Sequence, residues 1–269
     1  MPIIINSLTA LRLAFKANYA QMVTGSFMLV ALGILLSAYF GGRQPTTVAL
    51  DVGFSIIRFL LPIMIVLLAQ ELLSREFDKR YYFYSLSYPH ARYNLLLGRF
   101  TAMLVLVLGA LVALSLLQLG LVHFIGSTRP QATPVALGQP YLIVVAFIAL
   151  DLILLTAVAT LLAVVASTTS FVLVGTLGFM MVARSYSAIV ELLTYQAGLV
   201  SNTEDYRTGL GVLNYLLPDL GALDIRMLAL YGKPEFLPND WPWLIMSNLT
   251  YAVALLALAV WALQRKRFA

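Results

Sequence analysis

Three ionisable residues lie inside otherwise apolar stretches of this sequence: Arg58, Asp151 and Arg184. A charge within the hydrocarbon of a membrane costs about 3 kcal/mol unless it is paired, and such residues are often functional. We therefore expect Asp151 to pair with Arg58, with Arg184 or with both. Two roles remain open for the group: a polar lining or gate of a substrate path, and a structural ion pair that fixes helix register. One carboxylate facing two cations offers no proton relay, which favours the structural role.

Residues suited to other chemistry are scarce. The chain has no Cys, which excludes disulfides, thiolate metal sites and a Cys nucleophile. Its two histidines, His90 and His123, fall in a charged loop and at the edge of an apolar stretch. Neither a G-x-x-x-x-G-K-[ST] phosphate loop nor an H-E-x-x-H zinc motif occurs. We expect a chain that is not an enzyme, that binds no cofactor or metal itself, and that takes its energy from a partner.

The composition indicates an integral membrane protein. Of 269 residues, 61% are hydrophobic and 11% are charged, whereas soluble domains carry about 25% charged residues. A membrane-spanning helix needs about 20 apolar residues. The predicted spans are Met22–Phe40, Val52–Ala69, Phe100–Leu121, Tyr141–Ala166, Phe171–Val190 and Trp241–Leu263. Arg184 interrupts the fifth of these, which is retained because the link 167–170 is short enough only for a tight hairpin.

The distribution of charge predicts the orientation. One side of the predicted spans carries ten basic and three acidic residues, and the other carries seven basic and nine acidic residues. Since Lys and Arg concentrate on the cytoplasmic side, both termini and the loop 71–99 are expected in the cytoplasm. The net charge of +5 is thus a sign of topology and not of nucleic-acid binding.

Residues 3–19 are predicted to form an amphipathic helix in the membrane surface. Apolar residues share one face of this helix and polar residues another: Ile4, Leu8, Leu11 and Phe15 against Asn6, Thr9, Arg12 and Lys16. Such a helix places its cations among anionic lipid headgroups. The alternative is a cytoplasmic extension of the first span.

Two longer segments connect the spans. The loop 71–99 combines charges with the aromatic run Tyr81, Tyr82, Phe83 and Tyr84, which suits either a docking site for a partner or an interfacial aromatic belt. The segment 191–240 is too long for an unstructured loop. Its apolar pieces, Leu210–Leu217 and Leu223–Tyr231, predict short surface or re-entrant helices between spans five and six. The expected fold is thus all-α, a single transmembrane domain over residues 1–269.

This layout resembles the membrane subunit of type-2 ABC exporters. The residues that match that family's pattern around the second and third spans are Glu76, Leu86, Pro89, Arg92, Gly98 and Arg99. The family's Gly-Thr step is absent, with Arg80-Tyr81 in its place, and Arg99 stands where Lys is usual. The run Leu216-Leu217-Pro218-Asp219, followed by Asp224-Ile225-Arg226, is similar to a motif of the subgroup that includes the copper-site maturation permease of nitrous oxide reductase.

The resemblance implies an exporter subunit of the bacterial cytoplasmic membrane that works as a homodimer with two copies of a separate ATPase. ATP and Mg²⁺ would bind to the ATPase, which would grip a helix over Lys79–Ser87. The residues implied in this coupling are Glu76, Lys79, Arg80, Tyr81, Tyr82, Phe83, Tyr84, Leu86, Pro89 and Arg92. A non-transporting membrane scaffold that anchors a cytoplasmic partner is the alternative function, and an intramembrane enzyme is a third. The cargo stays open.

Overall fold

The computed structural model describes residues 2–16, 18–74, 92–129, 131, 133–166, 168–195 and 217–265. These residues form helices and connecting turns, with no strand among them. The elements are α1 (Pro2–Lys16), α2 (Tyr19–Phe40), α3 (Pro45–Ala69), the π-helical turn η1 (Gln70–Ser74), α6 (Arg92–Thr128), α7 (Gln139–Val165), α8 (Thr169–Tyr195), α10 (Met227–Tyr231), the 3₁₀ turn η3 (Pro234–Phe236) and α11 (Trp241–Arg265).

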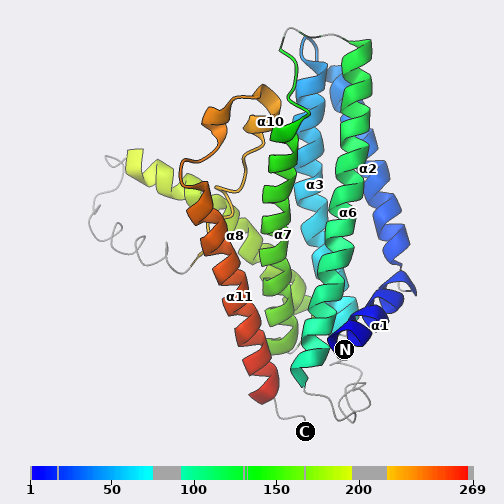
Figure 1. Cartoon of the computed structure of the whole chain (residues 1–269), viewed down its shortest axis with the longest axis vertical. Helices are drawn as coiled ribbons and strands as arrows, with labels where there is room; N and C mark the ends of the chain where they lie inside the picture. The colour runs from blue at the N-terminus through cyan, green and yellow to red at the C-terminus, as the bar shows by residue number, and fades with distance from the viewer. Residues whose placement is uncertain are drawn as a thin grey trace.

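Six of the helices are long and apolar enough to cross a membrane: α2, α3, α6, α7, α8 and α11. The all-helical membrane fold predicted from the sequence is therefore confirmed. The helices run alternately up and down, so that α1 begins and α11 ends at the same end of the bundle (Figure 1). We call this the terminal end, and the opposite end, where α10 lies, the distal end.

The most buried of the long helices are α3 and α7, and α7 packs against α3, α6, α8 and α11. In contrast, α2 and α11 lie at the edges of the bundle (Figure 1), and few of their residues are buried. The helix α8 crosses the bundle obliquely and projects from it toward Tyr195 (Figure 1). The core thus lies around α3 and α7, while the edge helices present apolar surface suited to lipid.

Several helices extend beyond the spans predicted from hydropathy. The helix α3 begins at Pro45 instead of Val52, because Pro is well suited to the first turn of a helix and the polar Thr46 and Thr47 tolerate that turn. With 37 residues, α6 is about 55 Å long and exceeds a hydrocarbon layer of about 30 Å. Hydropathy identifies the part of a helix that lies in the hydrocarbon layer, whereas the helix itself continues beyond that layer.

The first helix is separate from the first span. Asn18 has the left-handed backbone angle φ of 73°, which breaks the chain between α1 and α2. The helix α1 packs on α6, with Ala10 and Ala14 buried, and leaves Ile4, Leu8 and Phe15 exposed. The alternative of a straight extension of the first span is therefore wrong, and the exposed face is the one expected to meet lipid.

Two contacts hold the junction of α1 and α2, which we call the α1–α2 corner, against α6. Gly98 of α6 approaches α1 so closely that an added Cβ would lie 2.6 Å from the Cβ of Asn6 and 3.2 Å from the carbonyl oxygen of Ile3. The hydroxyl of Tyr19, at the start of α2, donates to the carbonyl of Leu106 over 2.7 Å. The chain before the first span is thus fixed to the first half of α6.

The segment between α8 and α11 returns to the distal end of the bundle. The predicted helix Leu223–Tyr231 is shorter than expected, since only Met227–Tyr231 is helical. The irregular chain before α10 nevertheless packs against the bundle, because its side chains Leu220, Leu223 and Ile225 are buried in the hydrophobic core. The predicted region 191–240 also begins later than expected, because α8 continues to Tyr195. The piece Leu210–Leu216 lies outside the described residues.

Candidate functional site

The structure brings Arg58, Asp151 and Arg184 together from three helices: α3, α7 and α8. Asp151 Oδ2 lies 2.5 Å from Nη2 of Arg184 and 3.6 Å from Nη2 of Arg58. The Asp151 side chain is 0% exposed and that of Arg58 is 9% exposed. Asp151 therefore contacts both arginines, which is one of the pairings expected from the sequence.

Pro62 explains part of this arrangement. In an α-helix the carbonyl of residue 58 accepts a hydrogen bond from the N–H of residue 62, and proline has no N–H. Nη1 of Arg184 donates to that carbonyl over 3.1 Å instead. In lipid every backbone polar group needs a partner. Arg184 thus satisfies both a buried carboxylate and a backbone carbonyl that the proline leaves without a helical donor.

Three further charged residues extend the cluster toward the distal end. Asp224 Oδ1 lies 2.7 Å from Nη1 of Arg58, and its Oδ2 lies 3.5 Å from Nε of Arg226. Nη1 of Arg226 lies 2.9 Å from Asp51 Oδ1 and donates to the hydroxyl of Ser55 over 2.7 Å. We call these six charged residues the ionic network: Asp51, Arg58, Asp151, Arg184, Asp224 and Arg226.

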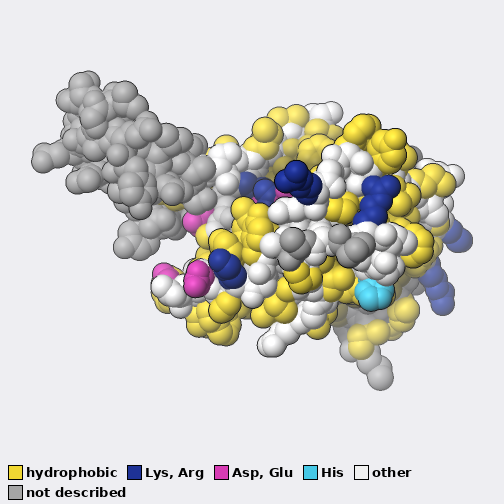
Figure 2. Space-filling model, turned by 90° about the horizontal axis from the view of Figure 1, so that it is seen from above, with side chains coloured by type: hydrophobic (Ala, Val, Ile, Leu, Met, Phe, Trp, Pro, Cys, Tyr) yellow, Lys and Arg dark blue, Asp and Glu magenta, His cyan; other side chains and the backbone are white. Residues whose placement is uncertain are grey.

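The ionic network contains three cations and three anions, so it is neutral as a whole. Its members come from α3, α7, α8 and the segment before α10, which it fastens to the spans. Seen from above, basic side chains occupy the middle of the distal end and hydrophobic side chains surround them (Figure 2). The network thus joins the distal segment to the charges inside the bundle.

Sequence reasoning missed three members of the network. Asp51 lies one residue before the predicted start of the second span, so hydropathy places it outside the spans. Asp224 and Arg226 belong to a motif that by itself indicates no ion pair. Their partners on α3 are more than 160 residues away in the sequence, and no local pattern reports such a contact. The available signal is the spacing of Asp224 and Arg226, which carry opposite charges two residues apart in an otherwise apolar stretch.

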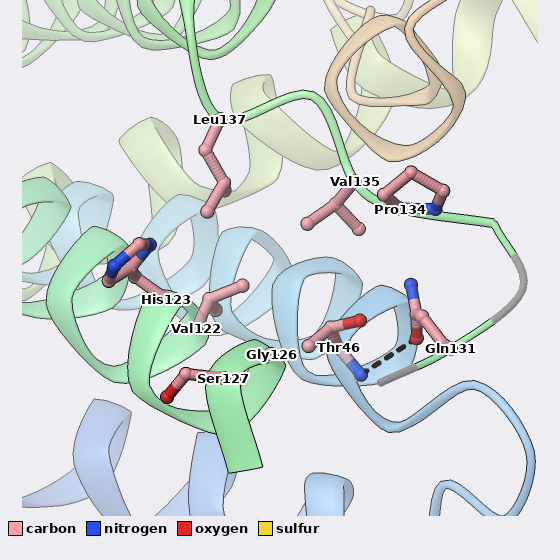
Figure 3. A pocket seen from close by; sticks show the side chains of 9 residues that line it. All are labelled: Thr46, Val122, His123, Gly126, Ser127, Gln131, Pro134, Val135 and Leu137. Carbon is pink, nitrogen blue, oxygen red and sulfur yellow. Dashed lines mark hydrogen bonds between the residues drawn. The ribbon is translucent and has the colours of Figure 1, made fainter. Parts of the chain in front are cut away.

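A cavity lies at the distal end, where α6 ends (Figure 3). Its volume is about 380 Å³, and its lining includes Thr46, His123 and Gln131. Gln131 Oε1 accepts a hydrogen bond from the Thr46 N–H over 3.2 Å, and its Nε2 donates to the Thr47 hydroxyl over 3.0 Å. The first N–H groups of a helix have no helical partner. Gln131 therefore caps α3 from the link between α6 and α7.

Another cavity, of about 470 Å³, lies at the terminal end. Its lining includes Asn18 of the α1–α2 corner, Gln70 and Glu71 of η1, and Thr169 of α8. Nε2 of Gln70 donates to the carbonyl of Thr169 over 3.2 Å. π-Helical turns occur frequently at functional sites, and η1 immediately precedes the loop expected to couple to a partner.

The implied coupling residues fall mostly outside the described part of the chain. These are Glu76, Lys79, Arg80, Tyr81, Tyr82, Phe83, Tyr84, Leu86 and Pro89. Arg92 is the first residue of α6, and only its backbone is described. Both described ends of the loop, Ser74 and Arg92, lie at the terminal end of the bundle (Figure 1).

Residues suited to metal binding do not converge in the described ranges. No group of three His, Cys, Asp or Glu side chains there could hold a metal ion. The acidic members of the ionic network face guanidinium groups, so their charges are already compensated.

Comparison with known proteins connects this architecture to a family. Residues 4–266 match the family model described as "ABC-2 family transporter protein". The match includes all six long helices, the α1–α2 corner and every residue of the ionic network. No curated protein matches the sequence.

Proposed function

This chain belongs to the ABC-2 family of transporter proteins, and from that premise we propose that it is the translocating subunit of an ATP-driven exporter. Membership in the family makes it a multi-pass membrane component of an ABC transporter and not itself a catalyst. The observation that carries the proposal is the family match over 4–266 on a bundle of six membrane-competent helices. Two copies would enclose the path, and two ATPase subunits would bind on one side.

The terminal end is the side where we place the ATPase. Both described ends of the loop 75–91 lie there, together with the ends of α1 and α11 (Figure 1). In the sequence, the segments predicted to share that side carry seven more basic than acidic residues, which supports a cytoplasmic location by the positive-inside rule. A bacterial cytoplasmic membrane is the location that fits such an exporter.

The contacts around the loop support a role in transmission. The loop leaves α3 through η1, which Gln70 ties to α8, and it enters α6 at Arg92, six residues before Gly98. A force on the loop would thus reach α3, α8 and α6, and through Gly98 also α1. This arrangement suits a coupling element better than a passive connection.

The test is co-purification with an ATPase encoded by a neighbouring gene, followed by ATP hydrolysis in proteoliposomes. We expect Arg80→Glu, or Tyr82→Ala with Phe83→Ala, to abolish stimulation of the ATPase while the chain remains folded. The matched control is Tyr39→Ala with Phe40→Ala, an exposed aromatic pair at the distal end, whose ring centroids lie 5.2 Å apart.

Full stimulation by the loop variants would refute the coupling assignment. A failure of any ATPase to bind the wild-type chain would favour the alternative of a membrane scaffold. The scaffold alternative also predicts that Asp151→Asn leaves activity unchanged, whereas a translocation path through the ionic network predicts a loss.

A further inference from the structure

The ionic network borders a cavity of about 360 Å³ between α3, α8 and the segment before α10. Its lining includes the hydroxyl of Ser55, the guanidinium groups of Arg58, Arg184 and Arg226, and the carboxylate of Asp224. Ligand pockets in proteins range from about 300 to 1,000 Å³. The cavity lies at the small end of that range and is large enough for a polar group of a ligand.

Asp224 differs from the other two carboxylates of the network. Asp51 and Asp151 belong to the long helices α3 and α7, whereas Asp224 lies in irregular chain before α10. The side chain of Asp224 is 33% exposed, against 0% for Asp151. Of the two carboxylates that contact Arg58, Asp224 is therefore the one that can leave without moving a spanning helix.

The contacts of Asp224 are those of a bound oxyanion. One carboxylate oxygen faces Nη1 of Arg58 at 2.7 Å, and the other faces Nε of Arg226 at 3.5 Å. Planar guanidinium groups recognise carboxylate and phosphate in the same way, through paired N–H donors. When Asp224 leaves, three cations of the network face only two carboxylates, and one negative charge is needed to restore neutrality.

We propose that this cavity binds an oxyanion, a phosphate or carboxylate group, which takes the place of the Asp224 carboxylate between Arg58 and Arg226. Asp224 is then a built-in competitor that fills the site while no ligand is bound. Phe59 borders the same cavity and is 60% exposed, so an apolar surface adjoins the polar floor. This combination suits an anionic group attached to an apolar body. If the bound anion is the transported cargo, the inference rests on the proposed function. Binding of the anion to the cavity does not depend on that function.

Binding can be measured on the purified chain without any ATPase. Pyrophosphate is titrated by calorimetry into the chain in neutral detergent, which tests a free oxyanion. The chain in nanodiscs of phosphatidylglycerol or phosphatidylcholine is then analysed by native mass spectrometry, which tests an anionic headgroup against a zwitterionic one. Binding of pyrophosphate or preferential retention of phosphatidylglycerol supports the site, and the absence of both overturns it.

Two pairs of variants locate the binding. Asp224→Asn removes the competitor and is expected to raise anion affinity about tenfold. Asp219→Asn removes the same charge from the same segment, where the carboxylate accepts the Ala222 N–H over 2.9 Å, and is expected to change affinity less than twofold. Equal effects of the two variants would show that only net charge matters, which overturns the proposal.

The second pair remains informative if Asp224→Asn does not fold. Arg226→Gln is expected to lower affinity about tenfold, because it removes one of the two guanidinium groups that hold the anion. Arg129→Gln removes a distal cation that instead faces the carbonyl of Ala38 at 3.5 Å, and it should leave affinity unchanged. Unchanged affinity in Arg226→Gln would also overturn the proposal. Neither result depends on an ATPase, so failure here is distinct from failure of the proposed exporter function.

Discussion

The strongest prediction concerns Arg184, whose guanidinium group contacts both Asp151 and the carbonyl of Arg58. Arg184→Met keeps much of the aliphatic stem and removes both contacts, of 2.5 Å and 3.1 Å. Removing one partner of a buried ion pair costs about 3 to 5 kcal/mol, and leaving a buried carbonyl unpaired costs about 1 to 3 kcal/mol. Arg58 remains 3.6 Å from Asp151 and Arg184 is 21% exposed, both of which reduce the loss. We expect a loss of about 3 kcal/mol in the free energy of unfolding.

A double-mutant cycle separates the ion pair from other effects. Asp151→Asn combined with Arg184→Met leaves no unpaired buried charge from this pair, so the double variant should be more stable than the sum of single losses predicts. We expect a coupling of about 2 kcal/mol. The free energy of unfolding is measured by sodium dodecyl sulfate titration of the chain in dodecyl maltoside micelles, followed by circular dichroism. Additivity within about 0.5 kcal/mol would refute the pairing.

The role of the carbonyl is tested with Pro62. Pro62→Ala supplies the N–H that the Arg58 carbonyl lacks in the helix, so it should recover about 1 kcal/mol in the Arg184→Met background. Pro45→Ala is the matched control, because Pro45 lies in the first turn of the same helix, where no helical hydrogen bond is missing. An equal recovery by both proline variants would show that Arg184 does not replace the missing donor.

Three further predictions concern the contacts that position the bundle. Gly98→Val should displace α1, because a Cβ at this position would lie 2.6 Å from Asn6 Cβ. Proteolysis between α1 and α2 should then become faster. Gly109→Val is the control and should have no effect, because no atom lies within 4 Å of a Cβ there. Tyr19→Phe should lower the free energy of unfolding by about 1 kcal/mol through loss of the hydrogen bond to Leu106, while Tyr39→Phe, at an exposed site, should leave it unchanged. Gln131→Ala should lower the free energy of unfolding by about 1 kcal/mol by uncapping α3, and hydrogen exchange at Thr46 should rise with it.

The sequence predicted the spanning helices because hydropathy responds to the solvent around a helix. It predicted the contact of Asp151 with arginine because a carboxylate within hydrocarbon needs a partner, and only Arg58 and Arg184 were within reach. Both are consequences of the membrane as a solvent, and they need no knowledge of the tertiary fold.

The remainder of the network depends on tertiary contacts. Asp224 reaches Arg58 from an irregular segment that has no periodicity to reveal which way its side chains point. The sequence does indicate that the carbonyl of Arg58 lacks its helical donor, because Pro62 lies four residues later and has no N–H. The identity of the replacement donor still required the crossing of α8 over α3.

The close approach of α1 to Gly98 has a consequence for the membrane around the protein. Ile4, Leu8 and Phe15 of α1 are exposed and suited to contact with lipid, and α1 packs against α6 near the start of that helix. A movement of α6 along the membrane normal would therefore move α1 relative to the lipid. The packing of the surrounding lipid headgroups would then resist such a movement, and we expect bilayers of different thickness to set different resting heights for α6.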